Sequence, residues 1–101
     1  MIDKKIKDLL NGEIDRQYFE NNFIASENFV SEEVKYLCGS EFTNKYAEGY
    51  PNKRYYNGCK YYDELENYAI KLLKKLYSCN FANVQPHSGA NANLAIFKAF
   101  L

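Results

Sequence analysis

This sequence of 101 residues lacks several features that mark whole classes of protein. Lys and Arg number 13, as do Asp and Glu, so the formal net charge is zero. Zero charge disfavours a nucleic-acid binder that relies on phosphate neutralisation. No apolar run approaches the length that spans a bilayer, and the first residues are charged rather than forming an apolar signal core or an Arg-rich transit sequence. We therefore expect a cytoplasmic protein with neither a membrane nor a nucleic acid as its partner.

Residues that form disulfides or bind metals are also scarce. The three cysteines, Cys38, Cys59 and Cys79, are far apart and form no CxxC pair, which favours three reduced thiols over a disulfide framework or a zinc site. The only histidine, His87, has no cysteine or acid at a suitable ligand spacing. His87 is also unsuited to activate Ser88, because adjacent side chains on an extended segment point to opposite faces. The sequence predicts no metal site and a structural role for His87.

The clearest secondary-structure signal is a helix over residues 61–77, where apolar side chains recur with helical spacing. A second apolar helix follows Ser88 and Gly89 and continues to Leu101, where the sequence stops without a cap or a polar tail. We therefore expect the sequence to be the N-terminal piece of a longer protein.

The other predicted elements are short, so we expect a mostly α-helical chain with long loops and one or two short strands. Asn11-Gly12 is expected to stop a first helix and to separate it from a second, weaker one. The short elements are helices over residues 2–10, residues 14–22 and Glu32–Cys38, the last capped by Ser31, and strands at residues 23–25 and residues 81–85.

Residues 43–58 have neither helical nor strand periodicity and predict a long loop. Long ordered loops are usually functional, and a disordered loop would seldom carry so much aromatic surface. Its four tyrosines could stack on a planar ligand or form a subunit interface. Glu48 could exchange a proton beside these rings or be a solvated surface acid, and Lys53-Arg54 could contact phosphate or carboxylate or simply form a solvated turn. The tyrosines are Tyr46, Tyr50, Tyr55 and Tyr56.

A second candidate site is the turn that leads into the last helix. A helix N-terminus presents unpaired N–H groups and attracts phosphate. Ser88, Gly89 and Ala90 are small enough to let an anion approach the backbone. Equally, Ser88 could only cap the helix while Gly89 eases the turn, because short motifs of this kind are common.

Four blocks of sequence, in this order and spacing, resemble the serine hydroxymethyltransferase family. The likeness covers essentially the whole chain, is weakest before Ile24, and favours the functional interpretations of Glu48 and Ser88. The blocks are Ile24-Ala25-Ser26-Glu27-Asn28-Phe29, Thr43-Asn44-Lys45-Tyr46-Ala47-Glu48-Gly49-Tyr50-Pro51, Arg54-Tyr55-Tyr56 with Gly58-Cys59, and Ala82-Asn83-Val84-Gln85-Pro86-His87-Ser88-Gly89-Ala90 with Ala92-Asn93.

The resemblance implies the α/β fold of the fold-type I transferases that depend on pyridoxal 5'-phosphate. Residues 1–23 would be an N-terminal helical arm, and residues 24–101 would begin the large domain that binds the cofactor. The implied reaction interconverts serine and glycine and passes a one-carbon unit to or from tetrahydrofolate, the co-substrate. The implied assembly is a homodimer or tetramer whose site is shared between subunits.

The resemblance also implies roles for residues around the substrates. Ser26 would help hold the substrate carboxylate, and Tyr56 would lie near the substrate. Glu48 would be the catalytic residue that handles the proton of the hydroxymethyl group. Tyr55 and Glu48 would lie near the folate.

Around the cofactor, the resemblance implies that Tyr46 reaches the phosphate from the neighbouring subunit. Ser88, Gly89 and Ala90 would cup the same phosphate. In the family, the lysine that forms the Schiff base and the main arginine that binds the carboxylate lie further along the chain. These 101 residues are therefore predicted to be inactive alone.

Two other classes of function stay open. One is a non-catalytic, truncated interaction fragment that docks through the arm and the tyrosine loop. The other is a single-strand nucleic-acid binder that stacks bases on the tyrosines, which the balanced charge disfavours.

Overall fold

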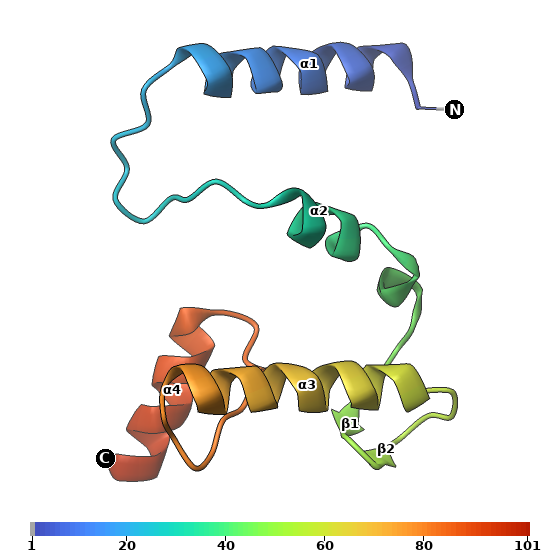
Figure 1. Cartoon of the computed structure of the whole chain (residues 1–101), viewed down its shortest axis with the longest axis vertical. Helices are drawn as coiled ribbons and strands as arrows, with labels where there is room; N and C mark the ends of the chain where they lie inside the picture. Colours follow the sequence, from blue (N-terminus) through green and yellow to red (C-terminus); the bar gives the residue numbers. More distant parts are fainter. Residues whose placement is uncertain (1) are drawn as a thin grey trace. The chain divides into compact units, whose positions relative to one another are not determined.

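The computed structural model describes residues 2–101, which divide into two units at Lys35 and Tyr36. The chain is mostly helical, as expected, and its two short strands lie at other residues than those predicted (Figure 1). The elements in chain order are α1 (Lys4–Phe19), α2 (Glu32–Cys38), the 3-10 helix η1 (Glu41–Asn44), β1 (Gly49–Tyr50), β2 (Lys53–Arg54), α3 (Lys60–Leu76) and α4 (Gly89–Phe100).

Helix α1 is one continuous helix, so the predicted stop at Asn11-Gly12 is wrong. The carboxylate of Asp3 begins the helix by accepting a hydrogen bond from the N–H of Lys5 at 2.9 Å. Arg16 pairs with Glu13 and Glu20, one turn before and one turn after it. Asn and Gly cost at most about 1 kcal/mol inside a helix, and the cap and these side-chain pairs favour continuation.

Neither predicted strand forms. Residues 23–25 run into a turn, closed by a hydrogen bond of 3.1 Å from the N–H of Glu27 to the carbonyl of Ile24. Residues 81–85 have no assigned secondary structure, and within residues 2–101 no strand pairs with them. A strand is stabilised by its neighbour, and a favourable side-chain pattern cannot replace that partner.

The predictions of α3 from its apolar spacing and of α2 from its serine cap are confirmed. Helix α3 covers the expected residues within one position at each end. Helix α2 begins where the Ser31 hydroxyl accepts a hydrogen bond from the N–H of Val34 at 3.4 Å. The backbone N–H of Glu33 and the Ser31 hydroxyl lower the pKa of the Glu33 carboxyl. This direction matches the preference of helix N-termini for negative charge.

The predicted long loop is more ordered than its sequence indicated, because the end of η1 and a β-hairpin lie within it. In the antiparallel hairpin Gly49 faces Arg54, and Tyr50 faces Lys53, so Pro51 and Asn52 form the turn. Asn52 has a positive φ of 62°, which asparagine tolerates better than most residues. The Tyr62 hydroxyl holds η1 against α3 by donating to the carbonyl of Phe42 at 2.7 Å.

Apolar burial contributes little to this chain. Among residues 2–101 only Cys59 is buried, with 5% of its surface exposed, while large apolar side chains on all four α-helices are exposed. The three cysteines are free thiols. No helix in the described part of the chain is both long and apolar enough to cross a membrane. Polar contacts therefore define the geometry of the second unit.

Candidate functional site

Glu48 lies directly before β1, and the hairpin fixes its backbone. Its carbonyl accepts a hydrogen bond of 3.1 Å from the N–H of Tyr55, across the hairpin. The next residue, Gly49, has a φ of 105°, and a side chain there would collide with the carbonyl oxygen of Lys53. Only glycine adopts this conformation without strain. The hairpin therefore needs glycine immediately after the candidate catalytic carboxyl.

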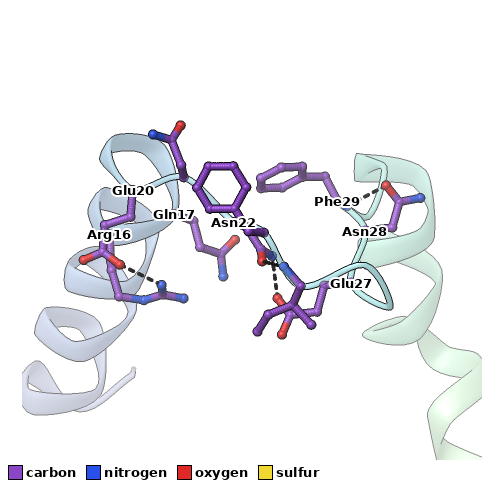
Figure 2. A pocket seen from close by; sticks show the side chains of 10 residues that line it. Arg16, Gln17, Glu20, Asn22, Glu27, Asn28 and Phe29 are labelled. Atoms are coloured by element: carbon purple, nitrogen blue, oxygen red, sulfur yellow. Dashed lines mark hydrogen bonds and ion pairs between the residues drawn. The ribbon is translucent and has the colours of Figure 1, made fainter.

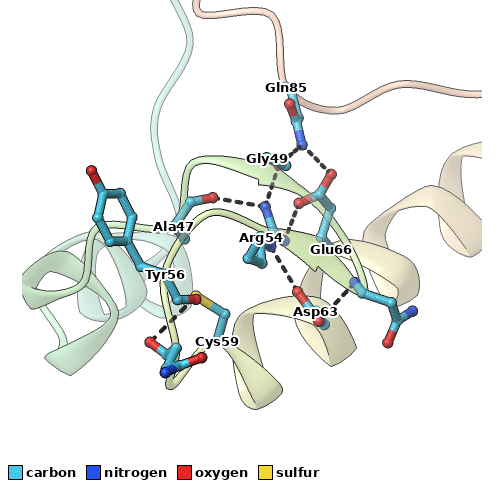
Figure 3. A network of polar contacts seen from close by, with 10 residues as sticks. Ala47, Gly49, Arg54, Tyr56, Cys59, Asp63, Glu66 and Gln85 are labelled. Carbon is cyan, nitrogen blue, oxygen red and sulfur yellow. Dashed lines mark hydrogen bonds and ion pairs between the residues drawn. The ribbon is translucent and has the colours of Figure 1, made fainter.

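Arg54 is the centre of a polar network (Figure 3). Its side chain is 7% exposed, and its Nη1 donates to the carbonyls of Ala47 at 2.8 Å and Gly49 at 2.6 Å. These two carbonyls lie on either side of Glu48 in the chain. Arg54 therefore braces the backbone before and after Glu48.

The other two nitrogens of the Arg54 guanidinium bind two carboxylates that lie one turn apart on α3. Nε donates to Asp63 at 2.7 Å, and Nη2 donates to Glu66 at 2.7 Å. Of the two interpretations of Lys53-Arg54, the solvated turn fits only the exposed Lys53, while Arg54 contacts carboxylates. Asp63 and Glu66 thus bind this arginine from the start of α3.

Asp63 is held in its charged form. It accepts hydrogen bonds from the N–H of Asn52, at 2.9 Å, and from Arg54. These two contacts, the Asn52 N–H first, lower the pKa of Asp63 below its usual value of 3.8. The carboxylate therefore joins the tip of the hairpin to the first turn of α3.

Gln85 connects this network to the segment that precedes α4. Its side-chain amide donates to the carbonyl of Gly49 at 2.9 Å and to Glu66 at 2.7 Å (Figure 3). Neither Gln85 nor Glu66 was predicted from the sequence to belong to the site. A possible signal was the three-residue spacing of Asp63 and Glu66, which places both carboxylates on one face of α3.

The tyrosines of the loop are only partly brought together. The rings of Tyr46 and Tyr56 meet edge to face, with their centroids 5.4 Å apart and their planes at 89°. Among the described residues, Tyr50 and Tyr55 make no ring contact of this kind, and both side chains are exposed. The paired and unpaired rings alike remain accessible to a ligand or to another subunit.

An open groove of about 870 Å³ gathers some of the predicted site residues in the second unit. Tyr46 and Glu48 line it together with His87, the residue before Ser88. Tyr55, Tyr56 and the turn at Ser88 do not line it. The other lining residues are Lys45, Ala47, Gly49, Arg54, Tyr62, Leu65, Glu66, Ala69, Val84 and Gln85.

Ser88 is the N-cap of α4. Its hydroxyl accepts a hydrogen bond from the N–H of Asn91 at 3.2 Å and lies 3.0 Å from the side-chain oxygen of Asn91. Gly89 and Ala90 occupy the first turn, where backbone N–H groups have no partner within the helix. Apart from the adjacent residues and the helix's own backbone, no atom lies within 4 Å of the position that a Cβ would take at Gly89. The helix begins at the predicted residue, and its N-terminus is open.

Ser26 belongs to the first unit, in the turn between Ile24 and Glu27. Beside it, Asn22 donates to Glu27 at 2.5 Å, and the end of α1 and this turn enclose a polar cavity of about 740 Å³ (Figure 2). Ser26 itself does not line that cavity. No cluster of three potential metal ligands occurs in the part of the chain that the structure describes.

One groove is lined by Tyr46 and by Glu48, whose neighbouring backbone Arg54 braces, and the helix N-terminus at Ser88 is a feature that favours anions. Comparison with known proteins identifies the class. The family model described as serine hydroxymethyltransferase matches residues 1–101, so the chain belongs to the serine hydroxymethyltransferase family. Membership implies the fold-type I architecture of transferases that use pyridoxal phosphate.

Curated relatives carry the same name. The chain is 57% identical to serine hydroxymethyltransferase of Ehrlichia canis over 100 residues, which are 99% of this chain and 24% of the relative. It is 54% identical to that of Campylobacter jejuni over 101 residues, 100% of this chain and 24% of the relative. It is 57% identical to the serine hydroxymethyltransferase of Campylobacter hominis over 99 residues, which are 98% of this chain and 24% of the relative. The chain thus spans about a quarter of the length of these relatives.

Proposed function

We propose that this chain forms part of the active site of a serine hydroxymethyltransferase. The whole enzyme interconverts serine and glycine and passes the one-carbon unit to or from tetrahydrofolate, with pyridoxal 5'-phosphate as cofactor. The observation that carries the proposal is the groove lined by Tyr46 and Glu48, with His87 leading to the open start of α4. In an assembly whose site is shared between subunits, a carboxyl, a phenol and an anion-binding turn match the needs of that reaction.

The chain's residues fit the phosphate of the cofactor. The N–H groups of Gly89 and Ala90 are free of intrahelical partners, the space at Gly89 is open, and the Ser88 hydroxyl adds a further polar group. Tyr46 would contribute its phenol from the neighbouring subunit. Ala90 binds through its backbone, so it needs no side-chain donor.

The other proposed roles concern the amino acid and the folate. When bound, pyridoxal phosphate supplies the electron sink that lets the bond between Cα and the hydroxymethyl carbon break or form. Glu48 takes the proton from the hydroxymethyl oxygen in one direction and returns it in the other. Ser26 holds the substrate carboxylate, Tyr56 lies near the substrate, and Tyr55 lies near the folate.

We also propose the wider setting of the site. Residues 1–23 serve as an arm, and residues 24–101 begin the cofactor-binding domain of a cytoplasmic homodimer or tetramer. The exposed apolar side chains on α1, α2, α3 and α4 support an assembly in which other protein covers them. Sedimentation of the complete enzyme distinguishes a dimer from a tetramer.

The test of the proposed function uses a chimera in which residues 1–101 replace the matching residues of the Campylobacter jejuni relative. We expect the chimera to bind pyridoxal phosphate and to convert serine to glycine when tetrahydrofolate is present. Glu48→Gln should lower kcat by about 100-fold, within the range for a lost proton-transfer group. Glu64→Gln is the matched control, because Glu64 is exposed on α3 and its side chain makes no hydrogen bond to any of residues 2–101.

A chimera that binds the cofactor but acts on another amino acid, and not on serine, would contradict the proposal. The alternative, a non-catalytic interaction fragment, is favoured by the many exposed apolar side chains. Size-exclusion chromatography of the isolated chain tests it. A stable dimer without cofactor supports the alternative, whereas aggregation supports a part of a larger enzyme.

A further inference from the structure

Tyr62, in the first turn of α3, holds η1 with both its hydroxyl and its ring. The hydroxyl donates to the carbonyl of Phe42 at 2.7 Å and lies 3.3 Å from the carbonyl of Glu41. The ring meets the ring of Phe42 edge to face, with the centroids 5.1 Å apart and the planes at 80°. Both aromatic residues are half-buried. One side chain of α3 therefore fixes the backbone and the side chain of Phe42 together.

The polar contact between η1 and α3 depends on this one tyrosine. Within residues 2–101, no side chain other than that of Tyr62 makes a hydrogen bond between the two elements. The Thr43 hydroxyl joins η1 instead to Cys38, the last residue of α2, by donating to its carbonyl at 2.7 Å. The neighbouring Tyr61 is exposed, and its hydroxyl makes no hydrogen bond to any of residues 2–101. Loss of the Tyr62 hydroxyl would therefore loosen η1 from α3.

The segment that leaves η1 carries Tyr46. The residue after η1 is extended, and Tyr46 follows it directly. On the other side of Tyr46, Arg54 donates to the carbonyl of Ala47 at 2.8 Å (Figure 3). Arg54 is bound in turn to Asp63, the residue next to Tyr62 on α3. The first turn of α3 therefore holds the chain both before and after Tyr46.

We propose that Tyr62 is a positioning residue that directs the phenol of Tyr46 to the cofactor phosphate of the neighbouring subunit. The inference rests on the proposed function, which assigns that phosphate contact to Tyr46. Tyr62, η1 and Tyr46 lie on one chain, so they would reach the neighbouring site together. The hydroxyl proton of Tyr62 is used by η1, so Tyr62 acts through the backbone of η1 and not on the phosphate itself. Hydrogen bonds weaken steeply with poor geometry, so a loosened η1 weakens the phosphate contact.

The first test is made on the chimera before pyridoxal phosphate is added. The N–H of Thr43 donates to the carbonyl of Ser40 at 2.9 Å, so its hydrogen exchange reports how firmly η1 is held. Tyr62→Phe removes only the hydroxyl and keeps the ring. We expect it to accelerate exchange at Thr43 by about two- to tenfold, the range for one lost hydrogen bond, and to leave the interior of α3 unchanged. Tyr61→Phe, the matched control, should change neither rate.

The second test measures the dissociation constant of pyridoxal phosphate by absorbance titration of the chimera. Tyr46→Phe, which removes the proposed phosphate donor, should raise this constant by about tenfold or more. Tyr62→Phe should raise it by about three- to tenfold, and Tyr61→Phe should leave it unchanged. In the double variant, Tyr46→Phe with Tyr62→Phe, the constant should equal that of Tyr46→Phe alone, because no phenol is left to position.

A spectroscopic measurement separates positioning from a general loss of stability. The phosphorus NMR resonance of bound pyridoxal phosphate depends on the groups around the phosphate. Tyr62→Phe should move this resonance in the same direction as Tyr46→Phe, whereas Tyr61→Phe should not move it. A loss of stability alone would lower the fraction of cofactor bound and leave the position of the resonance unchanged.

Any one of four results would overturn the proposal. They are an unchanged exchange rate at Thr43 in Tyr62→Phe, an unmoved phosphorus resonance in that variant, losses of affinity that multiply in the double variant, and a Tyr46→Phe chimera that binds the cofactor as tightly as the parent. A parent chimera that binds no pyridoxal phosphate would instead refute the proposed function. The exchange rate at Thr43 needs no cofactor and would still decide whether Tyr62 holds η1.

Discussion

The guanidinium of Arg54 lies 2.7 Å from the carboxylate of Asp63, and this ion pair joins the hairpin to the first turn of α3. Both side chains are mostly shielded from solvent, with 7% and 17% exposed. The stability of an ion pair that is this far buried depends on its geometry, because a buried charge is stable only when its hydrogen-bond donors and acceptors have partners. Arg54 meets this condition with hydrogen bonds to Ala47, Gly49, Asp63 and Glu66.

The first prediction is that Arg54→Lys disrupts the hairpin although the charge is kept. A lysine has one ammonium group on a flexible stem and cannot reproduce the rigid fork that serves all four partners. In the chimera we expect the Tyr55 amide to exchange at least tenfold faster and serine turnover to fall by about 100-fold. Lys53→Met, at the exposed neighbour, is the control and should change neither value.

The second prediction concerns pH. Because Asp63 has a folded-state pKa below its usual 3.8, its contribution to stability is fully present above that value and is lost as the pH falls through the lowered pKa. The Tyr55 amide should therefore lose protection below about pH 4, measured relative to the interior of α3. Asp63→Asn should make this difference in protection nearly independent of pH between 3 and 6.

Asp15→Asn provides the control for that experiment, because Asp15 is exposed on α1 and its side chain makes no hydrogen bond in the described residues. In this variant the protection of the Tyr55 amide should depend on pH as it does in the parent chimera. If Asp63→Asn keeps the acid-dependent loss at Tyr55, another group attaches the hairpin, and Glu66 is then the next carboxylate to replace.

Local signals in the sequence predicted the local elements well. The apolar spacing of α3 and the serine caps at Ser31 and Ser88 gave correct boundaries, because they depend on residues within one or two turns. The helix end predicted at Asn11-Gly12 was wrong, because the small cost of these two residues inside a helix does not outweigh the Asp3 cap and the side-chain pairs of α1. The hairpin was missed because its strands have two residues each, too few for any periodicity.

Contacts between distant segments could not be predicted in this way. The bonds from Gln85 to Gly49 and Glu66 depend on how three separate segments meet, and no spacing in the sequence encodes them. The sequence resemblance nevertheless selected Tyr46 and Glu48, which line one groove. The resemblance did not reveal what holds Glu48 in place, because it assigns roles only to residues that act on the substrates or the cofactor.

The third prediction compares two glycines. Gly49→Ala should destabilise the hairpin strongly, since its φ of 105° and the nearby Lys53 carbonyl leave no room for a side chain. Gly12→Ala should stabilise α1 by about 0.5–1 kcal/mol, because Gly12 lies inside the helix with open space around it. Circular dichroism and thermal unfolding of the chimera measure both changes. Similar effects from the two substitutions would show that the hairpin geometry is wrong.

The last prediction separates the two roles of Ser88. Ser88→Ala removes a cap from α4 and also a proposed ligand of the cofactor phosphate, whereas Ser31→Ala removes only the cap of α2. Each change should cost about 1 kcal/mol of stability through the lost cap. Only Ser88→Ala should also weaken pyridoxal phosphate binding, by about tenfold or more, because a hydrogen bond to a charged group contributes about 1.5–3 kcal/mol. Absorbance titration of the chimera with pyridoxal phosphate gives the two dissociation constants. Equal constants would mean that Ser88 serves the helix alone, and the phosphate would then have to be held by the backbone of Gly89 and Ala90.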